Sequence, residues 1–217
     1  GGSLYIVTFK DDFSRLITTY FLKNKSEVYE VFLKYVTMAE RQTGRKLKML
    51  RSDNGKEFIN KSFKNYCAKN GIIHQKTVAY TPQQNGVSER ANRTLCEMSR
   101  CMLELSGLPQ YLWAEAVSTS TYLRNRSPTS VLNDVTPYER WYKRKPLVFY
   151  LKVFGCDVVA LNKGPKVKSA KFVPKGRKYK FVGYDDTTKG YKLYNPNTKT
   201  IVISRDVVFF EESFENK

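Results

Sequence analysis

The sequence predicts an α/β domain followed by a small all-β unit, and two observations carry this prediction. Up to about residue 127, segments rich in β-branched and aromatic residues alternate with segments whose apolar residues recur at helical spacing. From about residue 147, short strand-like segments are separated by turns such as DDTTKG and NPNTKT. We therefore expect domains at 1–127 and 147–212, joined at 128–146 by a linker rich in proline and polar residues.

The first half of the chain is predicted to begin with an antiparallel hairpin. Segments 4–10 and 15–23 are rich in β-branched and aromatic residues, and the DDFS between them is turn-forming. The elements expected next are a helix from Ser26 to near Gly44, a strand at 46–53, a helix at 60–71 and a strand at 71–77.

The segment 80–87, YTPQQNGV, is predicted to be a loop because Pro82 and Gly86 disrupt regular structure. Two helices are expected after it, at 88–107 and 109–127, and Pro109 suits the first turn of the second. Strands of the all-β unit are expected at 150–161, 177–186, 190–196 and 200–210.

The charge of the chain favours a polyanionic partner. Its formal net charge is +18 at pH 7, and its isoelectric point is near 9.7. The basic residues are spread over both halves, which favours nucleic acid over a membrane surface. With no apolar run of about 18 residues and no signal-peptide pattern, a cytosolic or nuclear protein is expected.

The cysteines and the single histidine do not fit a zinc site. The four cysteines form no C-x-x-C pair, and His74 is the only histidine, so we expect no structural zinc. Each cysteine has apolar neighbours, which predicts buried free thiols at Cys67, Cys96, Cys101 and Cys156.

Two carboxylates are candidates for metal-dependent phosphoryl transfer, because hard cations such as Mg²⁺ take oxygen ligands. Asp53 ends a predicted strand in the turn RSDNGKEF, and Glu89 lies near the start of a predicted helix. Taken alone, each residue has a structural explanation. Aspartate often forms turns, and a glutamate in the first turn of a helix complements the helix dipole.

The wording and spacing around these carboxylates are specific. SDNGKEF is followed by the glutamate of YTPQQNGVSERANRTL, with 35 residues between Asp53 and Glu89. This arrangement resembles the second and third carboxylates of the D,D-35-E retroviral and retrotransposon integrases. The segments DDFSRLITTYFLKNKSE, TPYERW, LKVFGCDVV, KFVGYDDTTKGYKLYNP and ISRDVVFFEE are similar to the Ty1/copia branch. The resemblance implies an RNase H-like core followed by an SH3-like β-barrel.

Site residues follow from this resemblance position by position. It implies that Asp53 and Glu89 are catalytic ligands of a two-metal site for Mg²⁺ or Mn²⁺. It also implies DNA contacts from residues of the loop and the following helix, Tyr80, Gln84, Asn85, Arg90 and Arg93. For the two arginines, a solvated helix face is the alternative.

A dense basic run in KGPKVKSAKFVPKGRKYK favours the phosphate backbone without reading sequence, since it holds eight lysines or arginines and no acid. Its candidate contacts are Lys166, Lys168, Lys171, Lys175, Arg177 and Lys178. The alternation in RKYKFVGY is also typical of a half-buried strand, so its aromatic residues are expected in a core.

The chain departs from the family pattern at its start. The resemblance places the first catalytic aspartate in a strand before LYIVTFK, which this chain does not include. Asp11 and Asp12 are expected in a hairpin turn, with Asp12 satisfying turn amides. The predicted function is therefore an integrase region that is incomplete by itself, acting in the full-length protein as a multimer on DNA in the nucleus. The alternative is a non-catalytic nucleic-acid-binding module, and whether this chain is an enzyme stays open.

Overall fold

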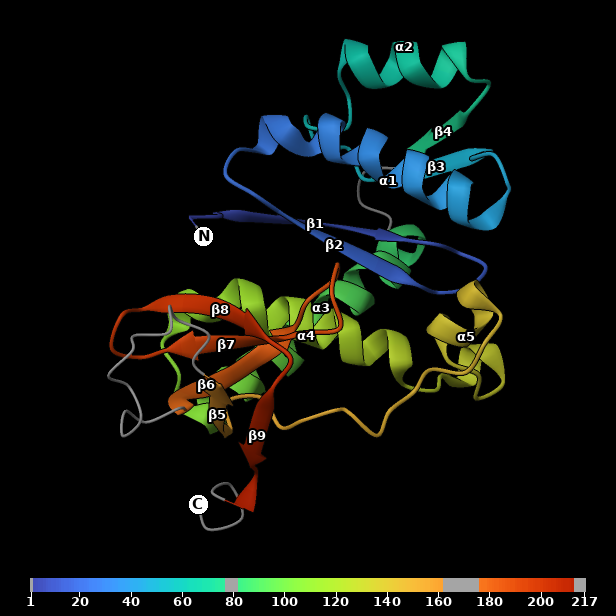
Figure 1. Cartoon of the computed structure of the whole chain (residues 1–217). Helices are drawn as coiled ribbons and strands as arrows, with labels where there is room; N and C mark the ends of the chain where they lie inside the picture. Colours follow the sequence, from blue (N-terminus) through green and yellow to red (C-terminus); the bar gives the residue numbers. More distant parts are fainter. Residues whose placement is uncertain (1, 77–81, 162–175, 213–217) are drawn as a thin grey trace. The chain divides into compact units, whose positions relative to one another are not determined.

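The computed structural model describes residues 2–76, 82–161 and 176–212. The chain divides into two compact units (Figure 1). The first comprises residues up to Leu95 together with Asn125–Lys145, and the second comprises Cys96–Arg124 and the residues from Pro146 on. Cys96–Arg124 thus belongs to the second unit, whereas the sequence analysis grouped these residues with the first domain.

The first unit begins with the predicted antiparallel hairpin. Strand β1 (Tyr5–Lys10) pairs with β2 (Ile17–Leu22). In the turn between them, Oδ2 of Asp11 accepts hydrogen bonds of 2.7 Å from both the backbone N and the Oγ of Ser14. Asp12 instead forms an ion pair with Arg15. The expectation that Asp12 satisfies the turn amides is therefore wrong, because Asp11 fills that role.

A helix follows the hairpin, as predicted. A 3₁₀ turn, Lys25–Glu27, leads into α1 (Val28–Thr43). At its start, the backbone N of Asn24 donates to Oε1 of Glu27 over 2.7 Å. At its end, Gly44 has a φ of 67° and its N–H donates to the carbonyl of Glu40, the usual geometry of a glycine after a helix.

The next three elements form a parallel pair of strands joined by a helix. Strand β3 (Met49–Ser52) pairs with β4 (Ile73–Lys76), and α2 (Lys61–Lys69) connects them. The helix begins at Asn60, whose side chain accepts a hydrogen bond from the N–H of Phe63 over 3.0 Å. A parallel connection needs such a crossover, and it brings the ends of β3 and β4 to the same edge.

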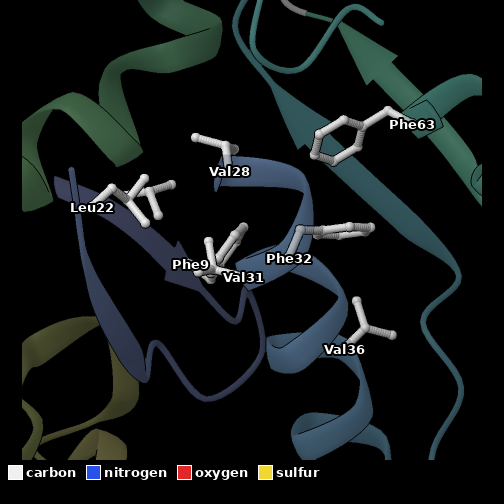
Figure 2. Close-up of a cluster of buried hydrophobic side chains, with 8 residues drawn as sticks. Phe9, Leu22, Val28, Val31, Phe32, Val36 and Phe63 are labelled. Atoms are coloured by element: carbon white, nitrogen blue, oxygen red, sulfur yellow. The ribbon is translucent and has the colours of Figure 1, made fainter. Parts of the chain in front are cut away.

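Helix α1 and its neighbours share one apolar core (Figure 2). Phe32 lies in the second turn of α1, and its ring centroid is 6.0 Å from that of Phe9 in β1 and 4.9 Å from that of Phe63 in α2. The buried members of this core are Val7, Phe9, Leu22, Val28, Val31, Phe32, Val36 and Phe63. Burial of the apolar face of α1 thus joins the hairpin to the β3–α2–β4 segment.

Three helices follow, and the first differs from the prediction. Helix α3 (Pro82–Ser106) begins at Pro82, so the prediction of a loop up to residue 87 is wrong. Proline fits the first position of a helix, where its missing N–H has no partner to lose. A 3₁₀ turn, Gln110–Leu112, then precedes α4 (Trp113–Arg126). The predicted second helix is present, but Pro109 is the extended residue before the 3₁₀ turn and does not lie in the first turn of the helix.

The predicted linker contains regular structure. It includes a 3₁₀ turn, Ser130–Leu132, and the short helix α5 (Pro137–Tyr142). The Thr136 side chain caps α5 by accepting from the N–H of Glu139 over 3.0 Å. Thr136 as the cap and Pro137 at the first helical position therefore favour a helix start within the predicted linker.

The second unit contains a five-stranded antiparallel sheet, which confirms the all-β expectation and fits an SH3-like domain. Its order is β8-β7-β6-β5-β9. The strands are β5 (Asp157–Leu161), β6 (Gly176–Tyr184), β7 (Tyr191–Asn195), β8 (Thr200–Ser204) and β9 (Val207–Phe210). Phe181 is fully buried in its core, and Tyr179 packs against it, as the sequence indicated.

Two strand predictions in this unit need correction. The segment 200–210 forms β8 and β9, not one strand, and these lie at opposite edges of the sheet because β9 pairs with β5. The segment 150–161 is a strand only from Asp157. Alternation of apolar residues predicts strands, but the pairing partners decide where each one ends.

The cysteine prediction is correct in part. All four thiols are free, but only Cys67 and Cys156 are buried, whereas Cys96 and Cys101 are exposed on α3. Burial raises the pKa of Cys156 to about 12, which makes it an inert thiol at neutral pH. Within the described ranges, no helix has the length and apolar character needed to cross a membrane.

We predict that Phe63→Ala lowers the free energy of unfolding by about 3 to 5 kcal/mol, because it leaves a cavity where helix α2 contacts α1. Phe149, with a side chain 81% exposed, provides the control, and Phe149→Ala should change the stability little. Urea denaturation followed by circular dichroism measures both variants. Equal stability losses would contradict this description of the core.

Candidate active site

Asp53 lies directly after β3, and its side chain is exposed. Its Oδ1 accepts a hydrogen bond from the backbone N of Gly55 over 3.0 Å. This contact closes the tight turn that the sequence DNG predicts. The carboxylate is therefore held at the end of a strand by its own turn, in contact with solvent.

The backbone before Asp53 is fixed by a polar pair of the buried Ser52 and the half-buried His74. The hydroxyl of Ser52 donates to the carbonyl oxygen of Asp53 over 3.0 Å and lies 2.8 Å from Nε2 of His74 on the neighbouring strand β4. Because the single hydroxyl proton points to the carbonyl, Nε2 of His74 acts as the donor to Ser52. Burial and the nearby charge of Lys76 lower the pKa of His74, so its ring is neutral at neutral pH.

The backbone after Asp53 is anchored in the core of the first unit. Phe58 follows the turn, and its ring centroid lies 5.6 Å from that of Phe63. Phe63 also lies 6.4 Å from the ring of His74. One buried side chain therefore contacts both segments that flank Asp53.

Gly55 leaves room for two carboxylates. A Cβ at this position would stand 2.8 Å from Cδ of Glu57 and 3.0 Å from Oδ1 of Asp53. The distance to Glu57 is shorter than Cβ atoms in proteins show. Only glycine therefore lets Glu57 approach the turn without displacing it. The sequence analysis assigned Gly55 to the turn but missed the approach of Glu57, for which the sequence holds no spacing signal.

Glu89 lies in the second turn of α3. The sequence predicts a first-turn position, but the helix begins earlier, at Pro82. Its side chain is exposed. One turn later, Oδ1 of Asn92 accepts a hydrogen bond of 2.7 Å from Oγ1 of Thr8 in β1. This contact holds the helical segment that carries Glu89 against the hairpin of the first unit.

The side chain of Arg90 extends along α3 toward the start of the helix. A Cβ at Gly86 would stand 3.4 Å from Nη1 of Arg90, so the guanidinium extends over the glycine toward the start of α3. Arg93 is exposed on α3 as well. Both arginines thus lie within about one helical turn of Glu89, as the sequence indicated.

The other predicted DNA contacts are described only in part. Arg177 and Lys178 are exposed on β6. Gln84 and Asn85 lie in the first turn of α3, but their side chains are outside the described residues. Tyr80, Lys166, Lys168, Lys171 and Lys175 lie outside the described residues altogether.

The donor set at this site fits a hard divalent cation in part. Asp53 and Glu89 both offer exposed carboxylate oxygens within the first unit. In the described part of the chain, however, no three or more histidine, cysteine, aspartate or glutamate side chains gather in a way that could hold a metal ion. Asp11 and Asp12 therefore do not complete a ligand set with them, since both are engaged in the hairpin turn.

Comparison with known families identifies the class of protein. Residues 1–82 match the integrase core domain, and residues 156–217 match the retroviral polymerase SH3-like domain. The fold of a chain in the cryo-EM structure of a simian T-cell lymphotropic virus intasome with PP2A regulatory subunit B56 gamma is also similar. That match has a TM-score of 0.52 and 16% identity, and it covers 94% of this chain and 71% of the other. The chain is an integrase region.

Curated relatives specify this class further. The chain is 47% identical over 211 residues to the retrovirus-related Pol polyprotein from transposon TNT 1-94 of Nicotiana tabacum, covering 97% of this chain and 16% of that protein. It is 33% identical over 210 residues to the Pol polyprotein from transposon RE2 of Arabidopsis thaliana, covering 97% and 14%. The chain therefore belongs to the integrase region of retrovirus-related Pol polyproteins of transposons, and it spans about one sixth of their length.

We predict that stability falls as the pH drops below about 6.5 and that His74 causes part of this fall. The pKa of His74 is lower in the folded protein than its ordinary value of 6.5, so the unfolded chain binds this proton more tightly. The stability that the neutral ring contributes is complete above pH 6.5 and is lost as the pH falls toward the lowered pKa. Thermal melts from pH 5 to 8 measure the effect.

His74→Gln is the matched variant, because it keeps an amide donor for Ser52 but does not titrate. Since His74 is the only histidine, the variant should show a flatter dependence of melting temperature on pH between 5 and 7. An unchanged pH dependence in His74→Gln would contradict the assignment.

Proposed function

We propose that this chain supplies two catalytic carboxylates and DNA-binding surfaces of a copia-type integrase, which processes the ends of element DNA and joins them to target DNA. The observation that carries this proposal is the exposed carboxylate of Asp53, held by Gly55 at the end of β3 and separated by 35 residues from the exposed Glu89. The family membership of the chain supports it.

Asp53 and Glu89 would hold Mg²⁺ or Mn²⁺ through carboxylate oxygens. The bound metal ions would lower the pKa of the attacking hydroxyl and stabilise charge on the leaving oxygen. Ser52 and His74 would fix the backbone that presents Asp53, and the Thr8–Asn92 hydrogen bond would fix the helical segment that presents Glu89. A further aspartate is proposed in a strand that precedes Tyr5 in the longer protein.

The reaction would need no energy cofactor, because end processing is a hydrolysis and joining replaces one phosphodiester with another. In end processing, water attacks a phosphorus atom near the end of the element DNA and the 3′ oxygen leaves. In joining, the new 3′ hydroxyl attacks a phosphorus atom of the target strand and displaces its 3′ oxygen. The protein's contribution would be to position the attacking group and both DNA strands.

The charge of the chain supports DNA as the partner. Arg177 and Lys178 are exposed on β6, while Lys180 is ion-paired with Asp157 over 3.0 Å and offers less charge to a partner. We propose that the longer protein acts as a homo-oligomer on two DNA ends, in the nucleus after synthesis in the cytoplasm. Contacts by Arg90 and Arg93 would place phosphates close to Glu89.

A chimaera tests the catalytic proposal. This chain replaces the 211 matching residues of the tobacco Pol polyprotein, and the integrase region is assayed for joining a labelled element end to plasmid DNA in Mn²⁺. We predict joining by the chimaera and a loss of at least about 100-fold in Asp53→Asn and Glu89→Gln, because each removes a metal ligand. Glu97→Gln, on the same exposed helix, should retain joining.

Two outcomes would contradict the proposal. One is joining that persists in both Asp53→Asn and Glu89→Gln. The other is a chimaera that binds DNA with normal affinity and does not join it, which would favour a non-catalytic DNA-binding module.

A further inference from the structure

The turn between β1 and β2 presents an aromatic ring surrounded by cations. Phe13 is 53% exposed, and three positive charges lie over its ring. The guanidinium of Arg140 lies 4.6 Å from the ring centroid, the ammonium of Lys143 5.6 Å and the guanidinium of Arg45 5.9 Å. We call Phe13, Arg45, Arg140 and Lys143 the Phe13 platform.

Three separate elements of the first unit build this platform. Arg45 follows Gly44 at the end of α1, whereas Arg140 and Lys143 lie at the end of α5. The two helices are joined beside the platform by a 2.9 Å hydrogen bond from Nε1 of Trp141 to Oε1 of Gln42. The cations therefore converge on the ring from a fixed framework.

The platform carries uncompensated positive charge. Cation–π contacts attract each charge to the ring, but the three cations repel one another. Among the residues that the structure describes, none of the three is ion-paired with a carboxylate. All three are exposed. Such a surface gains most from an anionic partner that can also contact the ring.

Lys143 occupies a backbone conformation that disfavours lysine. It caps the end of α5 with a φ of 58°, and its N–H donates to the carbonyl of Glu139 over 2.9 Å. Glycine is the usual residue at this position, because a side chain there is strained. Glycine would therefore fit this backbone without strain, so Lys143→Gly removes the side-chain charge without destabilising the end of α5.

A basic hollow adjoins the platform. It has a volume of about 400 Å³ at the end of α1 and shares Arg45 with the platform. Its one acid, Glu40, is already satisfied by Nζ of Lys46 at 2.8 Å and the N–H of Leu47 at 2.9 Å. Its lining residues are Thr37, Glu40, Arg41, Gly44, Arg45 and Lys46. The hollow thus continues the positive surface beyond the ring.

We propose that the Phe13 platform binds the sugar-phosphate backbone of DNA, with its cations on phosphates and its ring against a sugar or an unstacked base. This contact is additional to the carboxylate site and to Arg177 and Lys178 of the second unit. It reads no sequence, because phosphates carry no base information. DNA binding by the Phe13 platform does not depend on catalysis. A chain that cannot join DNA would therefore still bind DNA through the platform.

The test is the salt dependence of DNA binding by the 217-residue chain. Fluorescence anisotropy gives the dissociation constant for a labelled duplex of random sequence at KCl concentrations from about 50 to about 300 mM. The slope of log K against log salt over this range reports the number of phosphate contacts. Lys143→Gly and Arg140→Gln should each weaken binding several-fold and reduce the slope of log K against log salt by about 0.9. The double variant should reduce it by about 1.8.

Lys199→Gly is the matched control, because Lys199 also has a left-handed backbone, with a φ of 55°, in the turn between β7 and β8. It removes the same charge and relieves the same strain, and it should leave the slope near the wild-type value. Thermal melts accompany each titration. Lys143→Gly should melt at or above the wild-type temperature, which separates lost binding from lost folding.

Two results would overturn the proposal. One is a wild-type slope in the double variant, with or without a change in melting temperature, which would make the platform a structural contact only. The other is an equal reduction of the slope by Lys199→Gly, which would make the effect one of net charge. Failure of the joining assay has no bearing on either result.

Discussion

The contact between Phe32 and Phe63 is the interaction on which the first unit depends. Their ring centroids lie 4.9 Å apart, and each ring connects to a different part of the chain. Phe32 reaches the hairpin through Phe9, and Phe63 reaches both flanks of Asp53 through Phe58 and His74. The core therefore sets the position of the candidate catalytic carboxylate as well as the stability of the unit.

The two carboxylates are positioned by different means. Asp53 is held by its own turn and by the Ser52–His74 pair, all within one strand pair. Glu89 lies on α3, and the hydrogen bond between Thr8 and Asn92 links the first-unit segment of that helix to β1. Asp53 itself accepts one hydrogen bond from the N–H of Gly55, and both carboxylates are exposed.

Local patterns predicted much of the fold. The hairpin, α1 with Gly44 at its end, and the all-β character of the chain from Asp157 to Phe210 follow from periodicity and turn residues. The start of α3 differs from the prediction, because Pro82 disrupts a helix interior but fits a first turn. The split of 200–210 depends on strand pairing, which alternation does not encode.

The site was predictable in a similar measure. Asp53 and Glu89 are predicted from specific surrounding motifs, and their role as metal ligands stays a prediction. The turn at Gly55 follows from its composition. The Phe13 platform was not predicted, since its cations lie far from Phe13 in the sequence and share no motif with it. The exposure of Cys96 and Cys101 was also missed, because apolar neighbours on a helix do not show which face is covered.

The most direct test of the account is whether Asp53 and Glu89 bind one metal ion together. Mn²⁺ added to the isotopically labelled chain broadens the amide NMR signals of nearby residues. The account predicts concerted broadening at Asp53–Gly55 and at Glu89–Arg90, which disappears at both places in Asp53→Asn. Broadening at Asp53 alone, or broadening at Glu89 that survives in Asp53→Asn, would contradict a shared metal site.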